Sequence, residues 1–164
     1  MKTYEGFVSM LKANEVFVFG SNLIGFHGAG AAGFASFGVS GNHWRDRDYA
    51  SKPDGWKGRW NVKGMSVGYQ EGTEGASYAL PTMTAPGKPA KLNHIRRNIK
   101  QLYRYAEDNP DKNFLIAYTI KGYNINGYSN LQMAQQFAAN PIPENIVFEK
   151  GFGNLIQTVL NEEV

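Results

Sequence analysis

A short apolar run at residues 16–20, Val-Phe-Val-Phe-Gly, leads directly into a loop that is dense in glycine. No other feature of the chain constrains its fold as much. An apolar run this short that ends in glycine is typical of a strand buried on both faces, which is the kind of strand that parallel sheets contain. Residues 28–37 are rich in small side chains and predict a helix that packs closely on that strand. The first unit is therefore expected to be strand, glycine loop, helix.

The rest of the chain continues this alternation. Strands are predicted at residues 77–81, 113–119 and 145–148, and a glycine-punctuated turn at 68–75. Helices are predicted from Leu92 to about Asn109, from Ser129 or Asn130 to about Ala139, and after Gly153. Strands that alternate with helices predict an α/β fold with a mostly parallel sheet and helices on both faces.

Length and composition favour one globular domain over residues 1–164. The chain has 42% hydrophobic and 13% aromatic residues, and no apolar run approaches the roughly 20 residues that span a bilayer. It has no cysteine, and its first residues lack the pattern of a secretory signal, so we expect a cytoplasmic protein without disulfides. Scattered histidines predict no metal site, and we expect no cofactor.

Residues 42–64 form an excursion without helical or strand periodicity, and they contain all three tryptophans. Six basic residues are interleaved with the rings, which is the pattern of a surface that stacks single-stranded nucleic acid. The three aspartates of the same segment reduce its charge, and uncovered tryptophans would form an unusual exposed patch. A packed aromatic lid is therefore the interpretation that we favour, with single-stranded nucleic-acid binding as the alternative.

The glycine loop at residues 20–33 indicates a site for a phosphate-bearing ligand. Glycine lets the backbone approach a ligand closely, and backbone N–H groups beside a helix N-terminus bind anions. A second glycine-bearing loop, at 121–128, follows the strand predicted at 113–119, and the carboxyl ends of strands in such sheets form ligand crevices. Neither the P-loop nor the dinucleotide fingerprint is present. The alternative is a tight turn that merely lets the helix pack.

From residue 16 to residue 37 the chain resembles the macrodomain family, in which an Asn and a glycine-rich turn follow a buried strand. The spacing Asn22, Gly25, Gly28, Gly30, Ala32 is most similar to the branch of DNA-thymidine ADP-ribosyl hydrolases and terminal ADP-ribose glycohydrolases. Bacterial and phage macro-like proteins also look similar, through the His-Gly-Ala-Gly-Ala-Ala core at 27–32 and the Ser-Tyr-Ala-Leu-Pro-Thr strand at 77–82. The resemblance implies a three-layer α/β/α fold with a mixed, mostly parallel sheet.

The resemblance also implies a ligand, ADP-ribose or a related nucleotide, with ADP-ribosylated DNA or protein as partner. Asn22 would face the distal ribose and would be catalytic if the protein is a hydrolase. The implied ligand-binding residues lie on the two loops: Gly20, Ser21, Asn22, Gly25, His27, Gly28, Ala29, Gly30, Ala31, Ala32, Thr119, Lys121, Gly122, Tyr123, Asn124, Ile125, Asn126, Gly127 and Tyr128.

Departures from the family pattern leave hydrolysis and non-catalytic binding as alternatives. The family aspartate that contacts adenine has no counterpart, because no aspartate precedes Asp46. The hydrolase branch has a lysine where this chain has Met83, and an aspartate where it has Asn124 or Asn126. Lys88, Lys91 or Lys121 would replace that lysine only if the fold brings one of them close. Without such a group the protein would be a reader or sink for an ADP-ribose-like metabolite.

Three further features carry two interpretations each. His27 is a candidate general acid or base, or a phosphate donor, although a lone loop histidine is usually a structural hydrogen bonder. Gln70, Glu71 and Glu74 are candidates for a general base, or they form a solvated turn. Asn22 itself either contacts a ribose or acts as a turn residue that bonds its own backbone.

Overall fold

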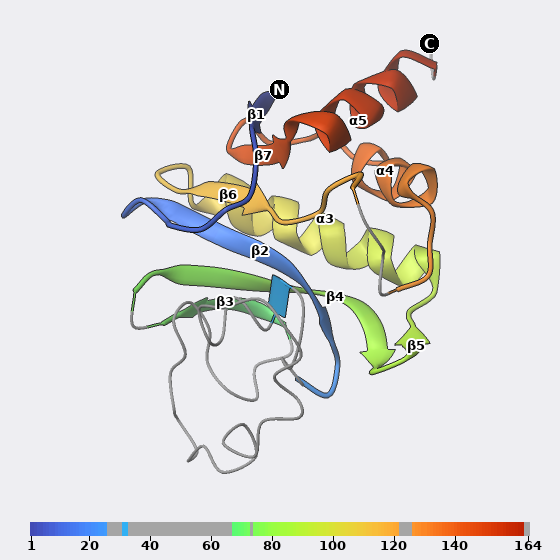
Figure 1. Cartoon of the computed structure of the whole chain (residues 1–164), viewed down its shortest axis with the longest axis horizontal. Helices are drawn as coiled ribbons and strands as arrows, with labels where there is room; N and C mark the ends of the chain where they lie inside the picture. Colours follow the sequence, from blue (N-terminus) through green and yellow to red (C-terminus); the bar gives the residue numbers. More distant parts are fainter. Residues whose placement is uncertain (26–30, 33–66, 73, 122–125, 163–164) are drawn as a thin grey trace.

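The computed structural model describes residues 1–25, 31–32, 67–72, 74–121 and 126–162, which form one mixed sheet and three helices (Figure 1). The strands across the sheet are β1 (Lys2–Tyr4), β7 (Ile146–Glu149), β6 (Asn113–Ile116), β2 (Glu15–Asn22), β4 (Ala76–Ala85) and β3 (Gly68–Glu71), with β5 (Lys88–Pro89) against β4. Neighbours from β1 to β4 are parallel, whereas β3 and β5 run antiparallel to β4. The predicted mixed, mostly parallel sheet is confirmed.

Strand β2 lies inside the sheet, as its continuous apolar run predicts. Val18 pairs with Tyr78 of β4 on one side and with Ile116 of β6 on the other. Its side chains alternate between the two faces of the sheet, and the four residues from 16 to 19 are all buried. Because a one-residue slip would move every side chain to the other face, burial on both sides fixes this register.

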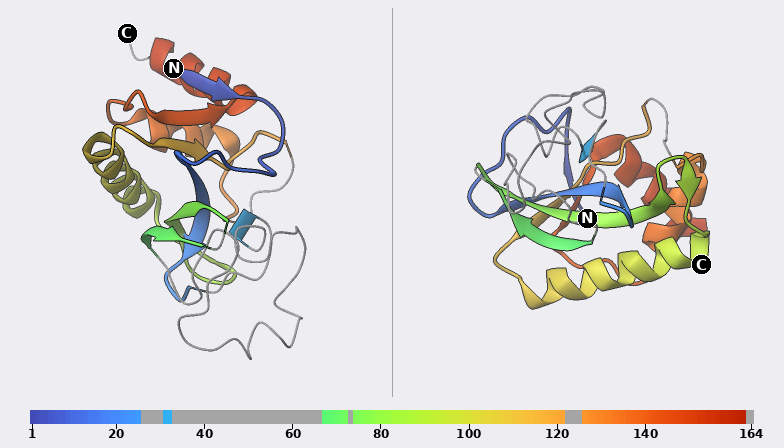
Figure 2. Two further views of the ribbon diagram at one scale, coloured as in Figure 1. Left: turned by 90° about the vertical axis from the view of Figure 1, so that its left-hand side faces the viewer. Right: turned by 90° about the horizontal axis from the view of Figure 1, so that it is seen from below.

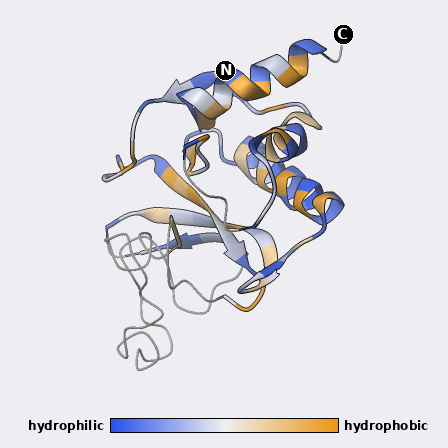
Figure 3. Ribbon diagram, turned by 45° about the vertical axis from the view of Figure 1, so that its right-hand side comes forward, coloured by the Kyte–Doolittle hydropathy of each residue, from blue (hydrophilic) through white to orange (hydrophobic). Residues whose placement is uncertain are grey.

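Helices α3 (Leu92–Asp108), α4 (Asn130–Ala138) and α5 (Lys150–Glu162) cover one face of the sheet (Figure 2). Hydrophobic and hydrophilic residues alternate along these helices, so that each has an apolar and a polar side (Figure 3). Phe137 of α4, Phe148 of β7 and Phe152 of α5 meet edge to face, with ring centroids 5.5 to 6.0 Å apart. Such aromatic pairs contribute about 0.5–1.5 kcal/mol each beyond their buried area.

A smaller cluster on the opposite face of the sheet consists of Phe17, Phe19 and Ala79, packed against Val8, Leu11, Ala31, Ala32 and Ala117. The helix predicted at 28–37 was expected on this strand, and of its residues Ala31 and Ala32 are described and lie there. The rest of that helix, and the aromatic excursion at 42–64, lie outside the described residues.

The structure corrects the strand predictions in several places. Residues 68–71 are not part of a turn but form β3, because Tyr69 and Gln70 pair with Tyr78 and Ser77 of β4. The short strands β1 and β5 were not predicted, and β4 is longer than the predicted 77–81. By contrast, β6 ends at Ile116 and not at Thr119.

The helix boundaries match the sequence at α3 and α4 and differ at α5. Ser129 is the N-cap of α4: its hydroxyl accepts from the Gln132 N–H, while the Gln132 side chain accepts from the Ser129 N–H. Helix α5 begins at Lys150 and includes Gly153, which was predicted to precede it. A Cβ at Gly153 would stand 3.0 Å from Thr3 Cγ2, so glycine permits close packing of α5 against β1. In the part of the chain that the structure describes, no helix is long and apolar enough to cross a membrane.

Asn145 joins the end of α3 to the start of β7. It is buried, and its Nδ2 lies 2.8, 3.1 and 2.9 Å from the carbonyl oxygens of Ala106, Asn109 and Lys112. One amide group has two N–H donors, so one of the three bonds is shared. The Asn145 side chain therefore ties the turn between α3 and β6 to the start of β7, in addition to the hydrogen bonds within the turn itself.

We expect Asn145→Ala to lower the free energy of unfolding by about 1–3 kcal/mol, because it removes a buried side chain that donates to three carbonyl groups. Urea denaturation followed by circular dichroism measures this change. Asn154→Ala, at an exposed position of α5, is the matched control and should change stability by less than about 0.5 kcal/mol. Equal unfolding midpoints for the two variants would contradict the proposed role of Asn145.

Candidate functional site

The sheet has a topological switch point between β2 and β6. The chain leaves β2 toward β4 on one side, and leaves β6 toward β7 on the other, in the strand order β1-β7-β6-β2-β4-β3. All four of these strands are parallel, so their carboxyl ends lie at one edge of the sheet. In open α/β sheets the crevice outside such a reversal is where ligands bind. The loops after β2 and β6 flank it, and these are the two loops that the sequence singled out.

Strands β2 and β6 part before β2 ends. Their pairing stops at Val18 and Ile116, followed by one bond from the Ala117 N–H to the Val18 carbonyl. Beyond this point β2 continues to Asn22 beside β4 alone, while Tyr118 packs on Phe152 with ring centroids 4.5 Å apart. The strand predicted to reach Thr119 therefore ends at Ile116. The segment after it packs on α5 through Tyr118, whereas the end of β2 is held by β4.

Asn22 organises the first loop through its side chain. Its Oδ1 accepts from the Ile24 N–H at 3.1 Å, and its carbonyl accepts from the Gly25 N–H at 3.1 Å. Gly25 has a φ of 79°, a conformation that glycine adopts without strain. The Leu23 N–H donates to the Met83 carbonyl and fixes the loop to β4. The structure thus shows the turn-forming role of Asn22, and its predicted ribose contact stays a prediction.

Asn126 organises the second loop in the same way. It is buried, its Oδ1 accepts from the Tyr128 N–H at 3.1 Å, and its Nδ2 lies 3.5 Å from Met133 Sδ in α4. Gly127 between them has a φ of 77°. The two loops of the switch point therefore each contain a buried asparagine whose side-chain oxygen closes a turn two residues ahead.

Tyr128 connects the second loop to the neighbouring strand. Its hydroxyl donates to the carbonyl of Ala90, and the Ala90 N–H donates to the carbonyl of Thr82 in β4. Thr82 in turn faces Gly20 of β2, where a Cβ would stand 3.2 Å from Thr82 Oγ1. A series of direct contacts thus runs from the second loop to the strand that carries the first. Tyr128 was predicted to bind the ligand. In the structure its hydroxyl donates to the Ala90 carbonyl and so connects the second loop to the segment that follows β4.

The predicted site residues fall into two groups. The structure describes eleven of them at the carboxyl edge or on the adjacent face: Gly20, Ser21, Asn22, Gly25, Ala31, Ala32, Thr119, Lys121, Asn126, Gly127 and Tyr128. The predictions on the rest lie outside the described residues: His27, Gly28, Ala29, Gly30, Gly122, Tyr123, Asn124 and Ile125. The hydroxyl of Thr119 donates to the carbonyl of Lys121, so Thr119 also stabilises its own loop.

The basic candidates lie near the switch point and the acidic candidates do not. Lys88, Lys91 and Lys121 are exposed and belong to segments that follow the carboxyl ends of β4 and β6. Glu71 lies at the opposite edge, because it pairs with Ala76, the first residue of β4. Its carboxylate accepts from the Tyr69 hydroxyl at 3.2 Å. Burial, with the nearby Glu71 charge, raises the pKa of Tyr69 to about 12. The acidic residues of the 68–75 segment are therefore remote from both loops.

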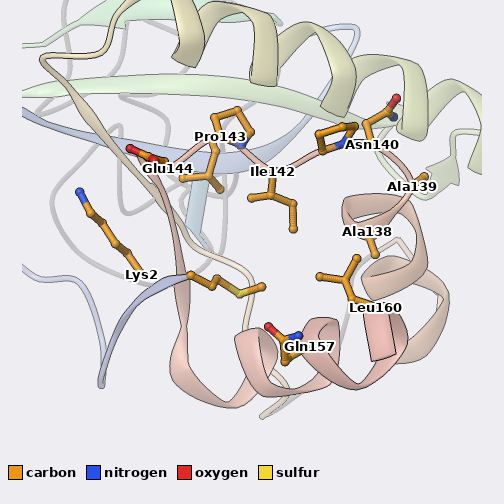
Figure 4. A pocket seen from close by; sticks show the side chains of 12 residues that line it. Lys2, Ala138, Ala139, Asn140, Ile142, Pro143, Glu144, Gln157 and Leu160 are labelled. Carbon is orange, nitrogen blue, oxygen red and sulfur yellow. The ribbon is translucent and has the colours of Figure 1, made fainter. Parts of the chain in front are cut away.

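A cavity of about 700 Å³ also lies at the opposite edge of the sheet (Figure 4). It is lined by the first residues of β1 and β7, the α4–β7 connection and α5, with Ile142 and Leu160 pointing into it and Lys2 and Glu144 at one end. None of the sequence-predicted site residues lines it. In open α/β sheets ligands bind outside the carboxyl ends of the strands, whereas this cavity lies at their amino ends. We therefore place the candidate site at the switch point, which the strand order and the two loops both indicate.

The sequence analysis missed several features of this edge. Leu23, Ile24 and Ile120 are large apolar side chains that are 57%, 65% and 41% exposed on the two loops. Exposed apolar groups beside polar turns are common where proteins bind ligands. The Asn-Gly pair at 126–127 was a signal for the second turn. Among the described residues, no three histidine or acidic side chains gather closely enough to hold a metal ion.

Comparisons with known proteins find similarity to solved structures but not to a sequence family. No protein-family model matches the sequence, and no curated protein matches it. Among solved structures, the chain is similar to "Thermosipho africanus DarTG in complex with ADP-ribose", with 11% sequence identity and a TM-score of 0.44. The likeness covers 84% of this chain and 38% of that one, so this chain spans well under half of the length of the protein it matches.

We expect Asn126→Ala to destabilise the protein by about 1–3 kcal/mol, because the partly buried Tyr128 N–H loses its acceptor and a buried side chain is removed. The exposed Asn93→Ala in α3 is the control. Urea denaturation gives the energies, and amide hydrogen exchange at Tyr128 reports the turn itself. Unchanged exchange at Tyr128 in Asn126→Ala would show that the side chain does not hold the loop.

Proposed function

We propose that this chain is a macrodomain-like protein that binds ADP-ribose or a related nucleotide diphosphate at the switch point between β2 and β6. The observation that carries the proposal is the pair of asparagine-centred turns at that point, on loops that follow two neighbouring parallel strands. Turns fixed before a ligand arrives reduce the entropy that binding must overcome. The macrodomain resemblance of residues 16–37 supplies the ligand class.

The proposed arrangement places the diphosphate between the two loops. The backbone amides of residues 28–32 and 122–127 would bind it, and Asn22 would face the distal ribose, as the family resemblance implies. The glycine content of both segments supports this assignment, because backbone amides without side chains accommodate anions closely. Leu23, Ile24 and Ile120 offer apolar area beside the same edge for the remainder of the nucleotide.

We further propose that the protein hydrolyses ADP-ribosyl linkages, with Asn22 positioning the ribose or an attacking water. Positioning alone supplies a substantial part of many rate enhancements, so activity without the family lysine is chemically reasonable. A reader without catalytic activity is the alternative, and the residue that favours it is Met83, which stands where the hydrolase branch has lysine. Its backbone carbonyl holds the first loop through the Leu23 N–H.

Calorimetry with free ADP-ribose tests binding. We expect a measurable heat and a thermal upshift at millimolar ligand, because even a millimolar dissociation constant corresponds to about 4 kcal/mol. Asn93→Ala, at an exposed position of α3, should bind as the wild type does. The absence of both signals at millimolar ADP-ribose would exclude specific binding of this ligand.

Asn22 variants distinguish hydrolysis from binding. Asn22→Ala removes both the amide and the acceptor for the Ile24 N–H, whereas Asn22→Asp keeps an acceptor there and so preserves the turn. If Asn22 acts mainly in the transition state, Asn22→Ala should reduce single-turnover release of ADP-ribose at least tenfold more than it reduces affinity. Asn22→Asp places a carboxylate at a buried position, so circular dichroism and urea denaturation must show that it is folded before its rate is compared.

The substrates for this measurement are ADP-ribosylated DNA and ADP-ribosylated protein. Binding of either one without turnover by the wild type would support the reader. Equal rates for the wild type and Asn22→Ala, with both folded and both binding ADP-ribose, would remove Asn22 from the mechanism.

A further inference from the structure

The positive charge of this protein is concentrated in one segment. Residues 76–106 contain six Lys and Arg residues and no Asp or Glu. The whole chain has 17 basic and 14 acidic residues and a net charge of +3. The residues outside this segment include 11 of the basic and all 14 of the acidic residues, so their net charge is −3. With six basic and no acidic residues, this segment therefore carries a net charge of +6, which is larger than the +3 of the whole chain.

Helix α3 presents most of this charge to solvent. Its inner side is the buried stripe Ile95, Ile99, Leu102, Tyr103 and Ala106. Its outer side carries three exposed residues, Arg97, Lys100 and Arg104. At a rise of about 1.5 Å per residue, they span about 10 Å along the helix axis. Lys88 and Lys91 lie just before the start of the helix and are also exposed. We call these five residues the α3 basic row.

Arg96 is the basic residue of the helix that does not belong to the row. Its Nε donates to Gln136 Oε1 of α4 at 3.0 Å, so its side chain serves the packing of the two helices. The members of the row have no comparable contact within the described part of the chain. Among the described residues, an ion pair forms between Lys150 and Glu5, beside β1 and β7 at the far side of the sheet.

The charges of α3 oppose the stability of the helix itself. Its first turn has no acidic residue and its last turn has no basic residue, which is the reverse of what the helix dipole favours. Lys100 and Arg104 lie four residues apart, a spacing at which like charges repel.

We propose that the α3 basic row binds the phosphate backbone of a nucleic acid. The exposed residues of α3 are all polar or charged, so the helix has no apolar side chain to insert into a lipid surface. It likewise lacks the apolar or aromatic anchor around which protein interfaces form. A phosphate backbone requires only a row of cations, and releases counterions when they bind. This proposal stands whether or not the switch point binds ADP-ribose.

The test is fluorescence anisotropy with labelled single-stranded and duplex oligonucleotides between 50 and 200 mM salt. The variant is Arg97→Gln/Lys100→Gln/Arg104→Gln, and the control is Lys2→Gln/Lys12→Gln/Lys150→Gln. Both remove three positive charges, and the control residues lie on or near β1, β2 and β7, away from α3. Circular dichroism verifies that both are folded, and the α3 variant should be no less stable because it loses like-charge repulsion.

We expect the wild type to bind at 50 mM salt and to weaken steeply as salt rises. The α3 variant should lose at least tenfold in affinity at 50 mM salt. Its slope of log affinity against log salt should be shallower by about 2 to 3, since each phosphate contact contributes about 0.7–0.9. The control should stay within about threefold of the wild type, because charges remote from the contact act only through the screened net charge.

Three outcomes would overturn the proposal. The first is an α3 variant that binds oligonucleotides as the wild type does. The second is a control that loses as much affinity as the α3 variant, which would mean a general effect of net charge. The third is binding to phosphatidylserine vesicles or to polyglutamate that equals or exceeds oligonucleotide binding, since a membrane or an acidic protein would then be the better partner.

Discussion

Strand β2 pairs in parallel with β4 on one side and with β6 on the other, and most of the other features depend on this double pairing. It places the carboxyl ends of the three strands together, so the loop after β2 and the loop after β6 meet at one edge. It also buries Val16 and Val18 under the helices and Phe17 and Phe19 on the opposite face. The doubly paired stretch ends at Val18, and the last residue of the strand, Asn22, is held by its pairing with Met83 of β4.

The early end of β6 leaves space between the two loops at the switch point. If β6 continued beside β2 to Thr119, hydrogen bonds between the strands would bring their ends together and leave no space between the loops. Tyr118 instead packs on Phe152, and its hydroxyl lies 3.3 Å from Asn130 Oδ1 at the start of α4. The position of the second loop is thus set by the α4 and α5 layer. The first loop is set by β4, and the bond from Tyr128 to Ala90 links the two supports.

The sequence predicted the features whose causes are local. The apolar run at 16–20, the stripe of α3 and the Ser129 cap each depend on residues within one turn or one strand. The missed features depend on distant partners: β3 forms because Tyr69 and Gln70 meet β4, and Gly153 lies inside α5 because Thr3 approaches it. At the site, an Asn in each loop was predicted, but spacing alone did not distinguish Asn124 from Asn126. The turn itself is local, because the Tyr128 N–H donates to Asn126 Oδ1 two residues before it, whereas the contact of Asn126 Nδ2 with Met133 Sδ depends on the distant helix α4.

The electrostatic arrangement relates the candidate site to the α3 basic row. Helix α3 begins just after Ala90, the residue that accepts from Tyr128, so the helix N-terminus lies beside the second loop. The positive end of its dipole and the cations Lys88 and Lys91 therefore lie at the same edge of the sheet as the two asparagine turns. The acidic residues Glu71 and Glu74 lie at the other edge, around the turn between β3 and β4. An anion approaching the protein is drawn by this asymmetry toward the switch point and along α3, since fields of this kind raise the local concentration of oppositely charged ligands. Small phosphorylated ligands and long phosphate backbones would thus be attracted to one side of the molecule for the same physical reason, although different residues would hold them.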